Sequence, residues 1–457
     1  MLQVIGVDGL GERKAVNDVL SALQAGLSAV DPARLVFRHL RRRGGKFYIN
    51  GLEINSRDVG EFVVLAVGKA AASMAEATLK VLGEKPVRGV VVVPHQTKIS
   101  PKLKSLETIY AGHPVPDQNS VKAGETLLEN ARKTGESSFA IILVSGGSSA
   151  LAAVPAEGIT LEDKQAVTKA LINAGATIHE LNTVRKHLSL LKGGWLAKNL
   201  RCKSVSLILS DVVGDRLDVI GSGPTVPDPT TYREALQILQ KYRIQAPANV
   251  VKRLEKGVAG EYPETPKPGD PAFHKITNVV IGRNADAVKA AAKELRKRKY
   301  KTVALTSGLV GEAREAAKLF AAIARDIIFN GIPHRPPTAV VAGGETTVTV
   351  EGTGVGGRNQ ELVLAAAIYM HDIRNFVFAS IGTDGIDGVT DAAGALCTEK
   401  TYENALGMGL QPEKFLKNND SHNFFKKAGG LVKTGPTGTN VGDLTILIVS
   451  GTNKRIM

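Results

Sequence analysis

The chain has 457 residues, of which 43% are hydrophobic, 22% are charged and only 5% are aromatic. This length indicates two domains rather than one ordinary core, and the composition excludes disordered and fibrous proteins. The net charge of +14 favours anionic partners, which include nucleotides, acidic metabolites and nucleic acid.

Short apolar runs alternate with longer alanine-rich helical patterns along most of the chain. Strands that are apolar throughout are those covered by helices on both faces, so the alternation predicts βαβ crossovers, a largely parallel sheet and the α/β fold class. Gly343 to Val350 instead alternates threonine and valine, which predicts a half-exposed antiparallel strand. The expected buried strands are Phe62–Val67, Gly89–Val93, Phe139–Val144, Val205–Leu209, Thr277–Ile281, Thr302–Thr306, Thr338–Val341 and Phe376–Ile381.

A proline-rich stretch, YPETPKPGDPA from Tyr262 to Ala272, interrupts this pattern. Four prolines and a glycine in so short a segment rule out a helix or a central strand. We therefore place the domain boundary here and expect one domain over residues 1–265 and a second over residues 273–457.

Lys69 ends the sequence FVVLAVGK and directly precedes a helical pattern. At a turn from strand to helix, its side chain is expected to face an anion beside the free N–H groups of the helix start. The segment is not a Walker A loop, because a glycine five residues before Gly68 and a Ser or Thr at Ala70 are both missing. The alternative is an ordinary surface lysine at a helix start.

A second turn of this kind reads IILVSGGSSA, from Ile141 to Ala150. Gly146 and Gly147 permit a close backbone approach, while Ser148 and Ser149 offer hydroxyl groups. Contact with a phosphate or carboxylate is favoured over a plain capped turn.

The sequence GTGVGG, from Gly352 to Gly357, formally matches the dinucleotide fingerprint GxGxxG. An acidic residue about 20 positions on should end the next strand, but Asp384 comes later, inside another glycine-rich loop. Arg358 follows the glycines directly and suits phosphate better than nicotinamide. A nicotinamide-dependent dehydrogenase nevertheless stays as an alternative.

Acidic residues follow two of the apolar runs, in LILSDVVGD and IGTDGIDGVTD. Asp211 and Asp384 are well placed to hold Mg²⁺ or to orient a hydroxyl group. For Asp387 and Asp391 we favour turn formation instead.

Polar residues share one face of the helix predicted in LNTVRKHLSLLKGG, from Leu181 to Gly194. Asn182, Arg185 and Ser189 recur at helical spacing, so they form a solvated face or line a cleft. His113 and His187 lack partners at metal-ligand spacing, and we expect structural roles for both.

With these motifs in view, the chain resembles the glycerate kinases of the MOFRL-domain family, which phosphorylate D-glycerate at its 2-hydroxyl group. The resemblance runs in order from about Ala15 to Val449. The blocks that carry it are VGKAAASMA (67–75), GHPVPDQNS (112–120), VSGGSSAL (144–151), LNTVRKHLSLLKGG (181–194), SDVVGDRLDVIGSGPTVPD (210–228), GGRNQE (356–361), GTDGIDGVTDAAGA (382–395) and GPTGTNVGDL (435–444).

The resemblance implies a Rossmann-like, doubly wound N-terminal domain and a smaller α/β C-terminal MOFRL domain, with the active site in the cleft between them. It also implies ATP and Mg²⁺ as cofactors and Lys69 and Arg358 as catalytic cations. Asp211 and Asp384 are expected in the same cleft, as catalytic residues and metal ligands. Substrate- or nucleotide-binding roles are expected for Gly146, Gly147, Ser148, Ser149, Asn182, Arg185, Lys192, Gly357 and Asn359.

The expected partners are small molecules, D-glycerate and ATP, and a homodimer is compatible with the sequence. A basic nucleic-acid-binding protein is the non-enzymatic alternative, disfavoured because the basic residues lack aromatic interleaving. Two distant cysteines and the absence of an apolar run of about 20 residues favour a reducing compartment and no membrane contact. We expect the cytoplasm, and the mitochondrial matrix also fits.

Overall fold

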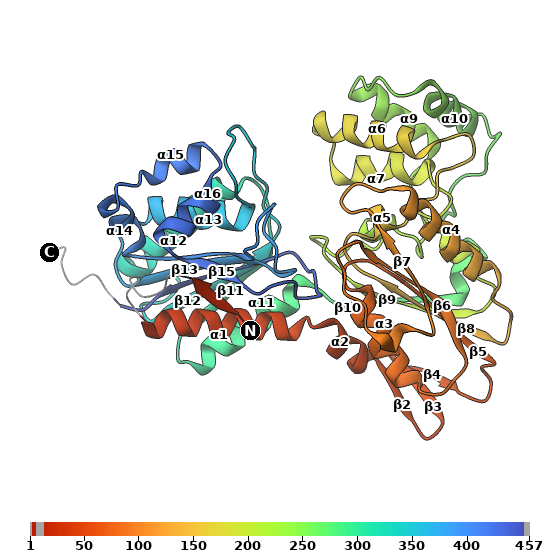
Figure 1. Ribbon diagram of the computed structural model, residues 1–457, viewed down its shortest axis with the longest axis horizontal. Helices are drawn as coiled ribbons and strands as arrows, with labels where there is room; N and C mark the ends of the chain where they lie inside the picture. The colour runs from red at the N-terminus through yellow and green to blue at the C-terminus, as the bar shows by residue number, and fades with distance from the viewer. Residues whose placement is uncertain (1, 6–12, 452–457) are drawn as a thin grey trace. The chain divides into compact units, whose positions relative to one another are not determined.

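The computed structural model describes residues 2–5 and 13–451. The chain folds into two compact units, one from Pro32–Gly282 and the other from Met1–Asp31 together with Arg283–Met457. One unit thus contains segments from both ends of the described chain. Figure 1 shows the red helix α1 (Arg13–Ala29) in the same unit as the blue C-terminal elements. Among the described residues, no helix is long and apolar enough to cross a membrane.

The unit formed by Pro32–Gly282 is built on a six-stranded parallel sheet in the order β10-β9-β8-β5-β6-β7. Its central strands are buried along their whole length, because helices cover both faces of a doubly wound sheet. The strands are β5 (Glu61–Val67), β6 (Val87–Pro94), β7 (Glu107–Ala111), β8 (Ser138–Val144), β9 (Lys203–Leu209) and β10 (Ile276–Gly282).

The helices of this unit divide into those that cover the sheet and a separate layer. Figure 1 shows α6, α7, α9 and α10 gathered beyond one end of the sheet, where residues such as Leu171, Val184 and Leu254 form their own small core. The helices are α2 (Pro32–His39), α3 (Ala71–Leu82), α4 (Gln118–Arg132), α5 (Ser148–Leu151), α6 (Leu161–Asn173), α7 (Ile178–His187), α8 (Trp195–Lys198), α9 (Tyr232–Lys241) and α10 (Ala248–Val258), with 3₁₀ turns at Pro101–Leu103, Ile220–Ser222 and Pro271–Lys275.

A small antiparallel sheet is formed by β2 (Leu40–Arg43), β3 (Lys46–Ile49) and β4 (Leu52–Asn55). Phe47 and Ile49 are buried, whereas the arginines of β2 are exposed. The basic cluster in this part of the chain is thus the outer surface of a hairpin.

The second unit contains a seven-stranded mixed sheet in the order β1-β15-β14-β13-β16-β12-β11. Helices α1 and α11 cover one face and α12, α13 and α16 cover the other. The strands are β1 (Gln3–Ile5), β11 (Lys301–Leu309), β12 (Thr338–Gly344), β13 (Phe376–Gly382), β14 (Gly394–Thr398), β15 (Leu431–Lys433) and β16 (Asp443–Val449); the helices not yet defined are α11 (Asn284–Lys297), α12 (Ala313–Phe329), α13 (Arg358–Tyr369), α14 (Thr401–Gly407), α15 (Pro412–Lys417) and α16 (Ser421–Ala428).

The predicted α/β class, with a doubly wound sheet and a second α/β unit, is confirmed, but three details differ. The chain passes between units after Asp31 and after Gly282, not within Tyr262–Ala272, because β10 pairs with β9 in the first sheet. The second sheet is mostly antiparallel, since β16 runs between β12 and β13 in the opposite direction. The strand expected up to Val350 ends at Gly344, and only an isolated bridge at Thr347 follows among the described residues.

Candidate active site

The first group of predicted site residues lies at the carboxyl edge of the parallel sheet. Strand β5 has its successors β6 and β7 on one side and β8 on the other, so the sheet reverses its winding between β5 and β8. Ligands of doubly wound proteins bind at such a point, outside the carboxyl ends of the strands. Lys69 follows β5, the Gly146–Ser149 loop follows β8 and Asp211 follows β9, the next strand along.

Lys69 and the glycine pair are in close contact at this point. The Lys69 N–H donates to the Gly146 carbonyl at 2.9 Å. Gly147 has a φ of +85°, and a β-carbon on it would lie 2.9 Å from Cδ2 of His113 and 3.5 Å from Cγ of Lys69. Glycine is therefore required both by the backbone conformation and by the side chains packed over it. His113, for which we expected a structural role, lies beside Lys69 at the predicted site.

A chain of hydrogen bonds connects several other predicted residues. The hydroxyl groups of Ser149 and Ser222 lie 2.8 Å apart, and Ser222 donates to Oδ1 of Asn182 at 3.0 Å. Lys192 Nζ donates to the Ser149 carbonyl at 2.7 Å and to the Ala152 carbonyl at 3.0 Å. The loop that contains Ser149 is thus connected by hydrogen bonds to α7, through Asn182, and to the segment after α7, through Lys192.

A cavity of about 710 Å³ opens beside this loop. Lys164 and Lys192 are 7% and 3% exposed, and they line the cavity together with the partly buried Arg185. Lys164 donates to the Leu188 carbonyl at 2.6 Å, and Arg185 Nε reaches the Thr168 hydroxyl at 3.5 Å. Burial lowers the pKa of all three cations, and their mutual repulsion lowers those of the two lysines further.

Within residues 2–5 and 13–451, these three cations form no ion pair with a carboxylate. The neighbouring Lys186 differs, because its Nζ lies 3.3 Å from Asp228 and 3.7 Å from Asp218. Buried charges in proteins are ordinarily paired, so an uncompensated cluster at a cavity wall is a feature of a binding site.

The charge on Lys164 makes the stability of the protein depend on pH. Burial, Arg185 and Arg253 lower its pKa in the folded state from 10.5 to about 7, so between these values the unfolded state binds more protons. Stability should therefore rise with pH above 7, by about 2 kcal/mol up to pH 9. Lys164→Met should make this rise smaller in urea unfolding measured at fixed pH values, without ligand, while the lowered pKa of Lys192 continues to contribute.

Other charged groups lie around Lys164, so the control variant must remove a lysine and leave these groups in place. Lys192 and Arg185 lie on the same cavity wall, Arg253 comes from α10, and Glu162 and Lys169 are on its own helix. Lys133→Met removes an exposed lysine directly after α4 and should keep the wild-type pH dependence. An unchanged slope in Lys164→Met would show that Lys164 is not the titrating group.

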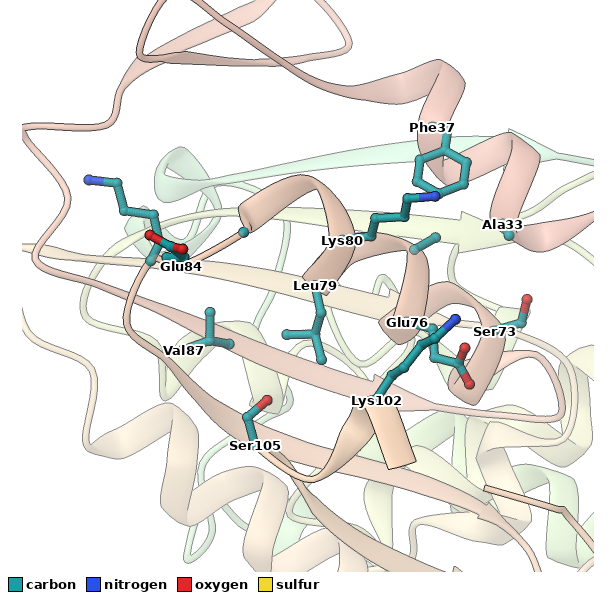
Figure 2. A pocket seen from close by; sticks show the side chains of 13 residues that line it. Ala33, Phe37, Ser73, Glu76, Leu79, Lys80, Glu84, Val87, Lys102 and Ser105 are labelled. Atoms are coloured by element: carbon teal, nitrogen blue, oxygen red, sulfur yellow. The ribbon is translucent and has the colours of Figure 1, made fainter. Parts of the chain in front are cut away.

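A hollow of about 880 Å³ on the same unit contains none of the predicted site residues. Figure 2 shows that its lysines are accompanied by the carboxylates Glu76 and Glu84, and that the Lys80 ammonium lies over the Phe37 ring, 5.6 Å from its centroid. Its lining thus mixes two carboxylates with three lysines, Lys80, Lys85 and Lys102. Volume alone does not identify the site.

The remaining predicted residues lie in the second unit, around the start of α13. Arg358 forms a bidentate ion pair with Asp443, with distances of 2.6 Å from Nε and 2.9 Å from Nη2, and its Nη1 lies 3.2 Å from Glu345. Burial opposes the charge on Arg358, but Asp443 and Glu345 raise its pKa. Asn359 donates to the same Asp443 carboxylate at 3.0 Å.

Asp384 belongs to this second group. It follows β13, its carboxylate accepts the Ile386 N–H at 3.1 Å, and its charge contributes to a raised pKa of Asp443, whose main cause is burial. No cluster of three or more potential metal-ligating side chains occurs in the described parts of the chain. The described residues thus offer pairs of carboxylates rather than a complete metal cage.

The glycine-rich sequence GTGVGG does not form a dinucleotide cradle. Its backbone N–H groups donate to Asn418, Asn419 and Asp420, and a β-carbon on Gly352 would lie 2.3 Å from the Asn418 carbonyl oxygen. Gly357 packs just as closely against Asp387. These glycines allow two loops of the protein to pack together, and the N–H groups of Gly352 and Gly354 already donate within the protein.

Asp387, expected to form a turn, instead caps α13. Its buried carboxylate accepts the N–H groups of Asn359 at 3.1 Å and Gln360 at 2.8 Å. Burial raises its pKa. Asp391 is exposed and pairs with Lys433, as suits a residue outside the site.

Sequence reasoning missed several residues that the structure places at these two groups. Lys164 reads as one more polar residue of an amphipathic helix, and Asp443 begins a strand that the pattern did not single out. Both are distant in sequence from the predicted residues that they lie beside in the structure. The sequence offered a signal for Asp443 alone, because it belongs to the last matching block, 435–444. The residues concerned are His113, Lys164, Ser222, Glu345 and Asp443.

Comparison with known proteins adds two family matches. The domain of unknown function DUF4147 matches residues 18–255, and the MOFRL family matches residues 338–443. A glycerate 2-kinase of Pyrococcus horikoshii is 42% identical over 94% of this chain and 96% of its own length. The D-glycerate 2-kinase of Thermotoga maritima is 44% identical, over 85% of this chain and 90% of its own.

Two Agrobacterium vitis proteins named putative hydroxypyruvate reductase are each 39% identical over 86% of this chain, and over 88% and 100% of their own lengths. Among solved structures, a glycerate kinase of Thermotoga maritima has a TM-score of 0.82 at 39% identity. The match covers 95% of this chain and 99% of that one.

Proposed function

Because the chain belongs to the family of glycerate kinases that combine a DUF4147 region with a MOFRL domain, we propose that it phosphorylates D-glycerate at the 2-hydroxyl group with ATP. The observation that carries the proposal within the structure is the convergence of Lys69, His113 and the Gly146–Gly147 turn where the parallel sheet reverses its winding. A cation beside a tight backbone turn suits a transferring phosphoryl group.

In this reaction the 2-hydroxyl oxygen attacks the γ-phosphorus, and the bond from that phosphorus to the bridging oxygen breaks. ADP leaves, and the hydroxyl proton passes to a carboxylate, for which Asp211 and Asp384 are the candidates. Lys69 neutralises charge on the phosphoryl oxygens, and the 146–149 loop positions the anion. Such transfer depends on positioning and charge stabilisation more than on covalent catalysis.

Arg358 takes part from the second group of residues. Its contacts with Asp443 and Glu345 use three of the five N–H groups of a guanidinium, and the other two point to a role in holding substrate oxygens. Asp443, whose carboxylate also accepts a hydrogen bond from Asn359, fixes the orientation of the guanidinium. This makes Asp443 a positioning residue rather than a catalytic one.

Mg²⁺ fits the oxygen donors of both groups. Magnesium is usually bound by one or two carboxylates together with substrate phosphates, and either Asp211 of the first unit or Asp384 of the second would supply such oxygens. The ion would neutralise charge on the phosphates of the nucleotide.

Hydride transfer from a nicotinamide is the alternative that two relatives' names suggest. The engaged N–H groups of the GTGVGG loop disfavour it, because a dinucleotide fingerprint needs them for pyrophosphate. Consumption of NADH with hydroxypyruvate, in place of ATP-dependent phosphorylation of glycerate, would reverse this choice.

The decisive test is ³¹P NMR of the purified protein with D-glycerate, ATP and Mg²⁺. We expect a signal of 2-phosphoglycerate that grows as ATP is consumed. A signal of 3-phosphoglycerate would retain the kinase but refute the acceptor position, and ATP that is stable in the presence of glycerate would refute the function.

A further inference from the structure

The cavity beside the serine loop has two chemically different parts. Lys164, Arg185 and Lys192 form a cationic wall, whereas Val115 and Ile172, which are 63% and 56% exposed, belong to an apolar part. Pro114, Pro116, Ala150 and Ala153 also line it, as do the exposed Glu162 and Lys169. A ligand that matches both parts carries several negative charges at one end and a flat apolar group at the other.

Size restricts the ligand further. Pockets of roughly 300–1,000 Å³ enclose molecules of drug size, and a cavity of about 710 Å³ is far too large for a three-carbon acid alone. Two residues that line the cavity are also sequence neighbours of residues at the Lys69 site. Pro114 follows His113, and Ser149 ends the loop that contains Gly147.

We infer that this cavity is the nucleotide site, with the phosphates of ATP against Lys164, Arg185 and Lys192 and the base against Val115 and Ile172. The inference rests on the proposed kinase function and deepens it by assigning the donor substrate to one unit. The terminal phosphate then lies toward Lys69, and the ligand supplies the buried cations with the ion pairs that they do not form with the carboxylates of the described residues.

The arrangement also accounts for Lys164, which no matching motif contains. Its ammonium donates to the Leu188 carbonyl, and Lys192 donates to two carbonyls, so both are held in place before the ligand arrives. Preorganised donors of this kind add affinity because they lose little freedom on binding.

Isothermal titration of the full-length protein with ATP and Mg²⁺, without glycerate, tests the inference. Lys164→Met and Arg185→Met should each weaken ATP binding about 10-fold or more, whereas the exposed-lysine control Lys133→Met should bind as the wild type does. Arg185 has only a long contact with Thr168, so its variant should fold even if Lys164→Met does not. Unchanged ATP affinity in a folded variant would overturn the site.

Inorganic tripolyphosphate separates the two parts of the cavity. Because the Ile172 side chain is exposed, the Ile172→Ser variant should keep its fold. Its affinity for ATP should fall, and its affinity for tripolyphosphate should stay unchanged. If ATP and tripolyphosphate respond alike, the base does not lie against Ile172 and the orientation is wrong. If the variants of Lys164 and Arg185 raise the KM for D-glycerate but leave ATP binding intact, the cavity belongs to the acceptor.

The two proposals fail separately. ATP binding that depends on Lys164, without phosphorylation of glycerate, would support the nucleotide site and refute the acceptor substrate. Phosphorylation of glycerate by a Lys164→Met enzyme with unchanged ATP affinity would support the kinase and refute this site.

Discussion

Replacement of Lys69 by methionine is expected to lower kcat by about 100-fold or more while the protein stays folded. A preorganised charge aimed at the group that is transferred typically contributes a factor of this size. Methionine keeps the unbranched stem that packs beside Gly147 and His113 and removes the ammonium group. The measurement is ATP turnover with D-glycerate at saturating concentrations of both.

The matched control is Lys133→Met, which removes one exposed lysine and leaves the net charge equal to that of the Lys69 variant. Its turnover should equal that of the wild type. Near-normal kcat in a folded Lys69→Met enzyme would exclude Lys69 from the chemical step, and a change in KM alone would make it a binding residue.

Asp387→Ala should destabilise the second unit by about 3 kcal/mol or more. The carboxylate is 2% exposed and accepts the backbone N–H groups of Asn359 and Gln360 and both of their side-chain amides. Each buried donor left without an acceptor costs roughly 1–3 kcal/mol. Urea unfolding followed by circular dichroism provides the measurement.

Asp391→Ala, in the same loop, is the comparison for this variant. Its side chain is 68% exposed and pairs with Lys433 at the surface, so its removal should change stability by less than about 1 kcal/mol. Equal stability of the Asp387 and Asp391 variants would mean that the cap contributes nothing beyond an ordinary surface contact.

The sheet of the first unit was predictable because its strands are buried on both faces. A run such as Phe139–Val144 is apolar at every position, and the structure places it in the centre of the sheet. The short strand β7 pairs only along one edge and includes the exposed Tyr110, so its pattern gave no signal. The family of the chain was recognisable from its motifs and is confirmed.

The boundary between units could not be found from composition. The proline-rich segment before β10 is a connection inside the first unit, and the passage at Gly282 and Arg283 carries no such signal. The amphipathic pattern of α1 shows that this helix covers a sheet, but not which one. Likewise, the sequence of α6 does not show that Lys164 is buried, because burial depends on α7 and α10 packing around it.

Helix α1 also bears on how the chain is made. Val16, Val19 and Leu23 fill the same core as Leu444 and Ile446, so this helix packs against strands that are made several hundred residues after it. At roughly 5–20 residues per second, translation separates these partners by tens of seconds. The inserted unit has all of its own strands by then and can fold on the ribosome. The apolar face of α1 stays without its partner strands during this interval and is exposed for that time to water or to a chaperone.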